Sequence, residues 1–258
     1  MLRQLHLLLT AVQFFTRLPV PAWVGHSAQQ LEQAARYLPL VGMLVGAIAA
    51  AVLYLSAQAL PLSLAVGLSM VASILVTGAF HEDGLSDFAD GFGGGHTKEK
   101  MLAIMKDSRV GAYGAIALVL VLLLKYQALL ELVGKRSLLF AAAALIAAHA
   151  VSRLMAASIM LTQRYVREDD SARAKPAAQL GHASFAVALL TGIASLGLLY
   201  VAGANAATVF SAAIAALLMR AYLAWRLQRR LGGYTGDCLG AVQQLTEIAF
   251  YLGLLAAL

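Results

Sequence analysis

Four acidic side chains crowd the end of a long apolar stretch in the segment HEDGLSDFADGFGGG, residues 81–95. They are Glu82, Asp83, Asp87 and Asp90. An acid near the centre of a bilayer costs about 2.5–3.5 kcal/mol, so lipid cannot surround four of them. We therefore expect them at the water interface or in a wet cavity, where several carboxylates together would bind a cation.

Three of these acids follow helical spacing, since Asp83, Asp87 and Asp90 are related as i, i+4 and i+7. A helix that continues from the apolar stretch would align them on one stripe. Carboxylates without His or Cys suit Mg²⁺, which prefers oxygen ligands and keeps waters and substrate phosphates. Glu82 is a further ligand or a base, and Gly84 would let a phosphate or another helix approach the backbone. The alternative is that the acids are ordinary solvated loop residues.

Two further groups of polar residues border or interrupt apolar stretches. The segment KDSRVGAYG places Lys106, Asp107 and Arg109 before the next stretch, and cations beside an acid suit a phosphate and metal site. Ordinary flanking charges are the alternative interpretation. Arg153 lies inside a later apolar stretch, one turn from His149. At that depth we expect Arg153 to pair with an acid or with a substrate phosphate.

The last apolar stretch opens with GGYTGDCLGAVQQLTE, in which Asp237 precedes the expected helix and Glu247 lies inside it. Glu247 could complete a second metal position, orient a hydroxyl, or bond structurally to Arg153 or Arg220. The spacing does not rank these possibilities. The candidate catalytic groups are Glu82, Asp90, Asp237 and Glu247.

The composition predicts a membrane protein. Of the 258 residues, 61% are hydrophobic and 12% are charged, against about 25% charged in ordinary soluble domains. Apolar stretches recur without a Pro/Ser-rich linker, which favours one domain over residues 1–258. The single cysteine excludes an internal disulfide framework. The net charge of +6 is spread over short loops, so nucleic acid is not an expected partner.

We expect an all-α, polytopic helix bundle that crosses the lipid bilayer about seven times. Each apolar stretch has about 18–24 residues, enough to cross a hydrocarbon core of about 30 Å. Residues 1–36 form an N-terminal interfacial segment with an amphipathic helix. The expected spans are Pro39–Leu60, Leu62–Phe80, Gly111–Val133, Leu138–Leu161, Ser184–Val201, Ala206–Trp225 and Leu239–Leu258.

The distribution of Lys and Arg predicts the orientation. Alternate threading places the N-terminal segment and the loops 81–110, 162–183 and 226–238 on one side of the membrane. That side carries most of the Lys and Arg outside the spans, so we expect it to be cytoplasmic. The acids would then face the cytoplasm. No internal repeat is evident, which argues against a transporter built from inverted repeats.

Five segments together resemble the cobalamin synthase family, the adenosylcobinamide-GDP ribazoletransferases. The region from Arg164 to Leu180 resembles the family poorly. The matching segments are FFTRLPVP (14–21), YLPLVGMLVG (37–46), HEDGLSDFADGFGGG (81–95), DSRVGAYG (107–114) and GGYTGDCLGAVQQLTE (232–247).

The resemblance implies a Mg²⁺-dependent transfer in a bacterial inner membrane, late in vitamin B12 synthesis. In that reaction α-ribazole or its 5′-phosphate displaces GMP from adenosylcobinamide-GDP, giving adenosylcobalamin or its 5′-phosphate. The acceptor hydroxyl must lose a proton while a pyrophosphate bond breaks. A carboxylate base, a metal ion on the phosphate oxygens and nearby Arg or Lys side chains would serve that chemistry.

The resulting hypothesis assigns one or two Mg²⁺ ions and leaves the oligomeric state open, a homo-oligomer included. A phosphotransferase acting on a CDP-linked lipid and a membrane cation transporter are the alternative functions. The expected metal ligands are Asp83, Asp87, Asp90, Glu82 and Asp107, and the expected substrate-binding residues are Lys106, Arg109, Arg153 and Gly84.

Overall fold

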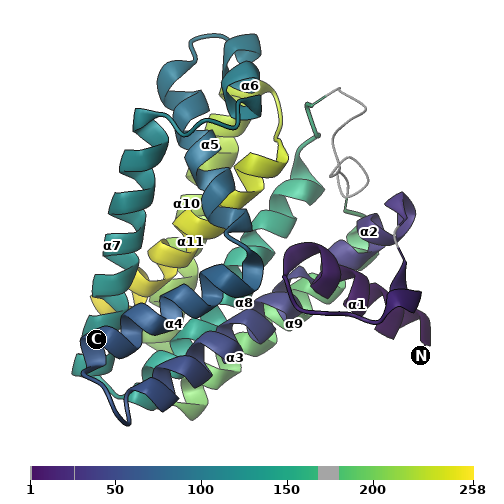
Figure 1. The fold of residues 1–258 in the computed structure, drawn as a ribbon. Coiled ribbons are helices and arrows are strands. Elements are labelled where there is room, and N and C mark those ends of the chain that lie inside the picture. The colour runs from purple at the N-terminus through teal and green to yellow at the C-terminus, as the bar shows by residue number, and fades with distance from the viewer. Residues whose placement is uncertain (1, 26, 168–179) are drawn as a thin grey trace.

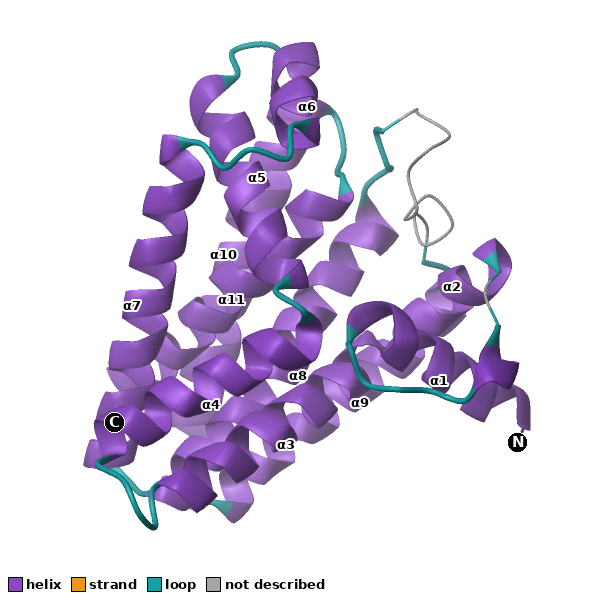
Figure 2. Cartoon of the chain, in the orientation of Figure 1, coloured by secondary structure: helices purple, strands orange, loops and turns teal. Residues whose placement is uncertain are grey.

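The computed structural model describes the whole chain except residues 1, 26 and 168–179 (Figure 1). Its described part is a bundle of α-helices with short connections (Figure 2). Strand pairing within that part is limited to one isolated parallel bridge between Tyr165 and Tyr234. The predicted all-α fold is therefore confirmed.

Eleven α-helices make up the described part of the chain, with single 3₁₀ turns at Ala22–Val24 and Ala35–Tyr37. The helices are α1 (Leu2–Phe15), α2 (Ala28–Ala34), α3 (Leu38–Ser56), α4 (Leu62–Thr77), α5 (Phe80–Gly94), α6 (Lys98–Lys106), α7 (Ala112–Lys135), α8 (Leu138–Thr162), α9 (His182–Val201), α10 (Ala206–Leu231) and α11 (Gly236–Ala256).

Six of these segments are long and apolar enough to cross a membrane, and the second expected span departs from the prediction. The helix there, α4, ends at Thr77, and the chain turns by 88° into α5. The turn forms because Gly78 and Ala79 both adopt left-handed backbone conformations, with φ of 66° and 57°, which end an α-helix. The count is therefore six spans, or seven if α4 and α5 together form one broken span.

Helices α8 and α11 form the centre of the bundle, with 78% of their most apolar windows buried. Small residues allow the neighbouring helices to approach α8 closely. A Cβ atom on Gly46 of α3 would lie 2.7 Å from Ile146 Cα, and one on Gly42 would overlap the His149 carbonyl. In lipid, where apolar burial drives helix association weakly, such close backbone packing is a main source of affinity between helices.

The outer helices expose the apolar surface that a bilayer would cover. On α7, Ile116, Leu120 and Leu123 are each more than half exposed, and Leu190 of α9 and Leu218 of α10 are similarly exposed. A soluble monomer rarely displays such continuous apolar faces. The described fold thus agrees with a polytopic membrane protein.

Hydrogen bonds join loops at each end of the bundle. At one end, Arg230 donates to the Gly95 carbonyl, which links the end of α10 to the end of α5. At the other end, Arg136 donates to the Gly203 carbonyl. The N-terminal segment joins the bundle through the Arg17 backbone N–H, which donates to the Val76 carbonyl at 2.7 Å. The loops thus group as the threading predicts, and the interfacial position of residues 1–36 stays a prediction.

Candidate active site

Helices α5 and α11 cross in close contact at two glycines. A Cβ atom on Gly84 would lie 3.0 Å from the Asp237 carbonyl oxygen, and one on Gly240 would lie 3.1 Å from Gly84 Cα. The backbone at Gly84 is therefore approached by another helix. Helix α11 covers the face of Gly84 where a side chain would be. This contact argues against the predicted role of Gly84 in substrate binding.

Three carboxylates flank this crossing, and we call them the acidic site: Asp83 and Asp87 from α5, and Asp237 from the first turn of α11. Asp83 is exposed and Asp87 is partly buried. Asp87 interacts electrostatically with both other members. Asp237 Oδ2 accepts hydrogen bonds from Arg167 at 3.0 Å and from the Thr235 hydroxyl at 3.2 Å. Arg167 thus offsets only part of the negative charge, which a bound cation would balance.

The acidic site offers carboxylate oxygens, which are suitable ligands for Mg²⁺. Its side chains are not arranged around one metal position. Among the residues that the structure describes, no three His, Cys, Asp or Glu side chains are grouped to hold a metal ion. The predicted ligand ladder Asp83–Asp87–Asp90 does lie on one helix, but its members end in different surroundings, from exposed to buried. Carboxylates at an open position fit Mg²⁺, which fills its octahedron with waters and phosphate oxygens.

Asp90 lies on α5, but its carboxylate binds the start of α7. Its Oδ2 accepts a hydrogen bond from Gly111 N–H at 2.7 Å, and its Oδ1 accepts one from Gly114 N–H at 2.9 Å. Both carboxylate oxygens thus satisfy backbone donors at the N-terminus of a helix, which also favours negative charge. This geometry argues against the predicted roles of Asp90 as metal ligand and as base.

The three charged residues predicted before α7 do not share one site. Asp107 and Arg109 bind each other, whereas Lys106 lines a separate groove. The Arg109 guanidinium donates to both oxygens of Asp107, with the shortest contact at 2.6 Å. This hydrogen bonding lowers the pKa of the exposed Asp107 carboxyl to about 2. Both oxygens of Asp107 therefore bind Arg109, and the predicted role of Asp107 as a metal ligand stays a prediction. Lys106, at the end of α6, lines a shallow groove together with Arg167.

Glu82 is buried one residue before the acidic site. Its Oε1 accepts a hydrogen bond from Gln244 at 2.8 Å, and its Oε2 has no partner among the described residues. A buried carboxylate oxygen without a hydrogen bond is costly, and such an atom is a candidate for proton transfer. One oxygen of Glu82 thus has no hydrogen-bond partner among the described residues, and its role as a base stays a prediction.

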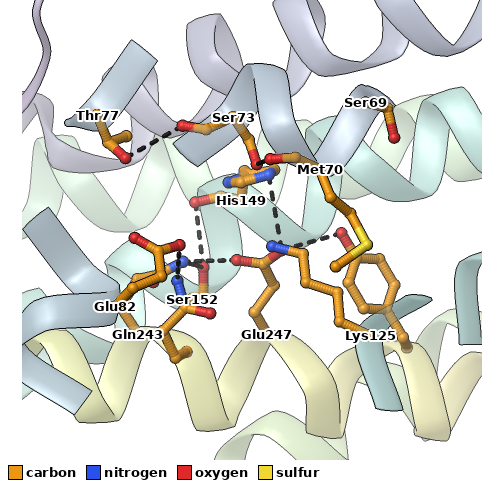
Figure 3. A network of polar contacts seen from close by, with 12 residues as sticks. Ser69, Met70, Ser73, Thr77, Glu82, Lys125, His149, Ser152, Gln243 and Glu247 are labelled. Atoms are coloured by element: carbon orange, nitrogen blue, oxygen red, sulfur yellow. Dashed lines mark hydrogen bonds and ion pairs between the residues drawn. The ribbon is translucent and has the colours of Figure 1, made fainter. Parts of the chain in front are cut away.

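Glu247 lies deeper, in a buried polar network at the centre of the bundle (Figure 3). Its Oε1 pairs with Lys125 Nζ at 2.6 Å and accepts a hydrogen bond from Tyr251 at 3.1 Å. Its Oε2 accepts one from Gln243 at 2.6 Å. Ten residues of helix separate Glu247 from Asp237, about 15 Å at 1.5 Å per residue. Both carboxylate oxygens of Glu247 have partners in this network, which favours a structural role over the predicted catalytic one.

The two arginines considered as partners of Glu247 bind elsewhere. Arg153 is 1% exposed and donates to the His149 carbonyl and ring at 3.0 Å, while its Nε has no partner among the described residues. Arg220 binds Ser158 and Thr162. Arg153 still interacts electrostatically with Glu82 and Glu247.

Several residues in these contacts were not among the sequence candidates, Lys125, Gln244 and Arg167 among them. Lys125 could have been found, because a Lys and a Glu inside apolar stretches need each other as counter-ions. Gln244 could not have been found, because a single Gln in a helix that contains other polar residues does not indicate a particular partner. Arg167 lies at the edge of the segment that resembles the family poorly, and only the folded chain brings it to Asp237.

Fold and site together define a class: a polytopic helical membrane protein with a carboxylate site where two of its helices meet. A family model described as cobalamin-5-phosphate synthase matches residues 7–255. The chain belongs to this family.

Individual relatives match along almost their whole length. An adenosylcobinamide-GDP ribazoletransferase from Shewanella frigidimarina is 48% identical over 255 residues, which cover 99% of this chain and 96% of the relative. One of the same name from Leptothrix cholodnii is 47% identical over 260 residues, which cover 99% and 97%. No solved structure matches the chain.

Proposed function

We propose that the chain joins adenosylcobinamide-GDP to α-ribazole or its 5′-phosphate, releasing GMP, with the chemistry at the acidic site. A ribose hydroxyl of the acceptor attacks the phosphorus that carries the corrinoid. A new P–O bond forms, the bond to the GMP phosphate oxygen breaks, and the hydroxyl proton passes to a base. The names of the relatives supply the substrates, and the acidic site supplies a place for the reaction.

The observation that carries this proposal is the electrostatic interaction of Asp87 with Asp83 and Asp237 beside the glycine contact of α5 and α11. A pyrophosphate donor is itself anionic, so it cannot bind beside three carboxylates unless a cation lies between them. We propose that Asp83, Asp87 and Asp237 hold Mg²⁺. When bound, the ion would neutralise charge that develops on the phosphate oxygens.

The side chains around the acidic site have separate tasks in this proposal. Arg167 holds Asp237 in position through its hydrogen bond and adds positive charge near the donor. Lys106 lines the same groove as Arg167 and would contact a phosphate that enters there. Glu82 accepts the hydroxyl proton at Oε2, the oxygen that lacks a hydrogen bond among the described residues.

We also propose that the acidic site faces the cytoplasm of the inner membrane. The end of the bundle that carries it holds the basic loops, and short loops rich in Lys and Arg stay cytoplasmic. Nucleotide-linked substrates are supplied on that side. Family membership favours ribazole transfer over the two alternatives, a CDP-alcohol phosphotransferase and a cation transporter.

The test measures GMP release by the purified protein in detergent as the Mg²⁺ concentration is varied. We expect Asp83→Asn, Asp87→Asn and Asp237→Asn each to lower turnover by about 100-fold or more, since a catalytic metal supplies several kcal/mol of charge stabilisation. Asp107→Asn is the matched control, because its carboxylate binds Arg109. Near-normal turnover in all three site variants would refute the acidic site as the place of reaction.

A further inference from the structure

A charged groove lies between helix α6 and residues 166–167. Its free volume is about 440 Å³, within the range of roughly 300–1,000 Å³ that small-molecule sites occupy. The lining combines apolar side chains with the carboxylate of Glu99 and the cations Lys98, Lys106 and Arg167. Three cations against one carboxylate favour an anionic ligand that also carries hydrogen-bond donors.

The groove adjoins the acidic site through Arg167. This side chain lines the groove and donates to Asp237 Oδ2 at 3.0 Å. Its guanidinium has five N–H donors, enough to bind a phosphate as well. Helix α6 also packs against the start of α11, since the Met105 sulfur lies 3.9 Å from the Thr235 hydroxyl, and Lys106 follows Met105. A phosphate that binds Lys106 and Arg167 would therefore lie beside the acidic site.

Backbone hydrogen bonds hold the wall of the groove opposite α6. The Val166 N–H donates to the Tyr234 carbonyl, and the Tyr234 N–H donates to the Arg164 carbonyl, both at 3.0 Å. These bonds fix the segment before Arg167 against the loop that precedes α11. The groove is therefore formed on both sides, so a ligand spends little of its binding energy on ordering the walls.

Helix α6 presents its groove residues on one face. Their spacing is i, i+3, i+4 and i+7, and they are Glu99, Leu102, Ala103 and Lys106. Glu99 and Lys106 lie at opposite ends of this stripe, about 10 Å apart along the axis at 1.5 Å per residue. A nucleoside monophosphate spans a similar length from the edge of its base to its phosphate. The stripe thus offers a cation at the end near the acidic site, an apolar middle and a carboxylate at the far end.

The carboxylate of Glu99 matches one nucleobase in particular. Its two oxygens accept hydrogen bonds and cannot donate them. The Watson–Crick edge of guanine has two adjacent donors, the N1–H and the N2 amino group, so one carboxylate can bind both. Adenine has an acceptor at N1 on that edge, which a carboxylate repels. Leu102 and Val166 are partly buried and line the middle of the groove, where they would contact the faces of the ring.

We propose that this groove binds the guanine nucleotide half of the donor and that Glu99 selects the guanine, an inference that rests on the proposed ribazole transfer. The base lies between α6 and Val166, and Glu99 accepts hydrogen bonds from its N1–H and N2 amino group. Lys106 and Arg167 bind the phosphate. This placement directs the pyrophosphate of the donor at Asp237 and the metal site proposed there.

Nucleotide binding to the purified protein tests the inference without turnover. Equilibrium dialysis of labelled GMP, inosine monophosphate and AMP is made with wild type and with Glu99→Gln. Inosine monophosphate lacks only the N2 amino group of GMP. Hydrogen bonds to a charged group strengthen binding by roughly 10- to 150-fold, so we expect wild type to prefer GMP by at least about tenfold and Glu99→Gln to lose most of that preference. Glu131→Gln, a loss of a carboxylate that pairs with Lys135, is the control and should keep it.

Steady-state kinetics add a second measurement and separate this inference from the proposed function. Glu99→Gln, and Ala103→Phe, which fills the groove from α6, should raise the KM for adenosylcobinamide-GDP about tenfold. The KM for α-ribazole should change by less than about twofold. An unchanged donor KM and GMP preference in folded Glu99→Gln would overturn the groove assignment and leave the proposed function standing. A guanine preference that depends on Glu99, in a protein that transfers no ribazole, would overturn the function alone.

Discussion

Gly84 of α5 and Gly240 of α11 pack backbone to backbone, so that a Cβ atom on Gly84 would lie 3.3 Å from Gly240 Cα. This contact brings Asp237 to the two acids of α5. A Cβ atom at either glycine would be so close to the other helix that the backbone would have to shift by a few tenths of an ångström. The assembly of the acidic site therefore depends on two residues that carry no functional group.

The first prediction is that Gly84→Ala and Gly240→Ala lower both stability and activity. Forcing extra atoms into a packed contact costs about 1–3 kcal/mol, and separating the helices moves Asp237 away from Asp83 and Asp87. Thermal unfolding in detergent and GMP release measure the two effects. Gly67→Ala is the control, because a Cβ atom there meets nothing within 4 Å. Full activity in both site variants would show that the close crossing is dispensable.

The second prediction concerns the buried pair of Lys125 and Glu247. Replacing one partner leaves a buried charge without its counter-ion, so Lys125→Met and Glu247→Gln should each destabilise the protein by about 3–5 kcal/mol. The double variant should lose less than the two single losses combined. Lys135→Met is the control, since Lys135 and Glu131 form an exposed pair whose loss should cost less than about 1 kcal/mol.

The Mg²⁺ dependence of activity tests whether Glu247 takes part in metal binding. Folded Glu247→Gln should keep the wild-type Mg²⁺ concentration for half-maximal GMP release, because Glu247 lies about 15 Å along α11 from Asp237. A raised Mg²⁺ requirement in a variant of normal stability would return Glu247 to the metal site.

The third prediction separates capping from metal binding at Asp90. Asp90→Ala removes two hydrogen bonds to the start of α7, and loss of a helix cap costs about 0.5–2 kcal/mol. Asp90→Asn keeps an acceptor oxygen and should lose less. In neither variant should the folded protein need a different Mg²⁺ concentration for GMP release. A stable Asp90→Asn protein that needs much more Mg²⁺ would support the original ligand ladder.

The fourth prediction concerns Arg167, the cation that binds Asp237. Removing it with Arg167→Gln makes the acidic site more negative, so Mg²⁺ should bind at lower concentration. The anionic donor should bind more weakly, and its KM should rise. Titration of GMP release against Mg²⁺ and against donor measures both effects. Lys135→Gln, a loss of charge at the opposite end of the bundle, should change neither, and an unchanged donor KM in Arg167→Gln would exclude the proposed role.

Helix positions were largely predictable because their signals are local. Long apolar stretches must form helices in lipid, where every backbone N–H and C=O needs an internal partner. Caps such as Ser137 and Asn205 mark their starts. The break at Gly78 and Ala79 was missed, because the apolar stretch runs through it and a left-handed Ala has no sequence signal.

The candidate site was predicted in part for the same reason. Asp83 and Asp87 share a helix, so their spacing alone placed them together. Asp90 shares that spacing as well, yet its oxygens bind the backbone of α7, a partner that lies outside any local pattern.

By itself, the sequence determined the helical class, the family and the acidic segment, since hydropathy and motifs act over neighbouring residues. Only the tertiary structure decided which charges meet. Asp237 flanks the same helix crossing as Asp83 and Asp87 because two glycines let α5 and α11 touch. Glu247 lies with Lys125 because the two helices set them at one depth, where a buried charge needs a counter-ion. Contacts between distant segments depend on helix crossings, and one sequence read along its length contains no direct record of them.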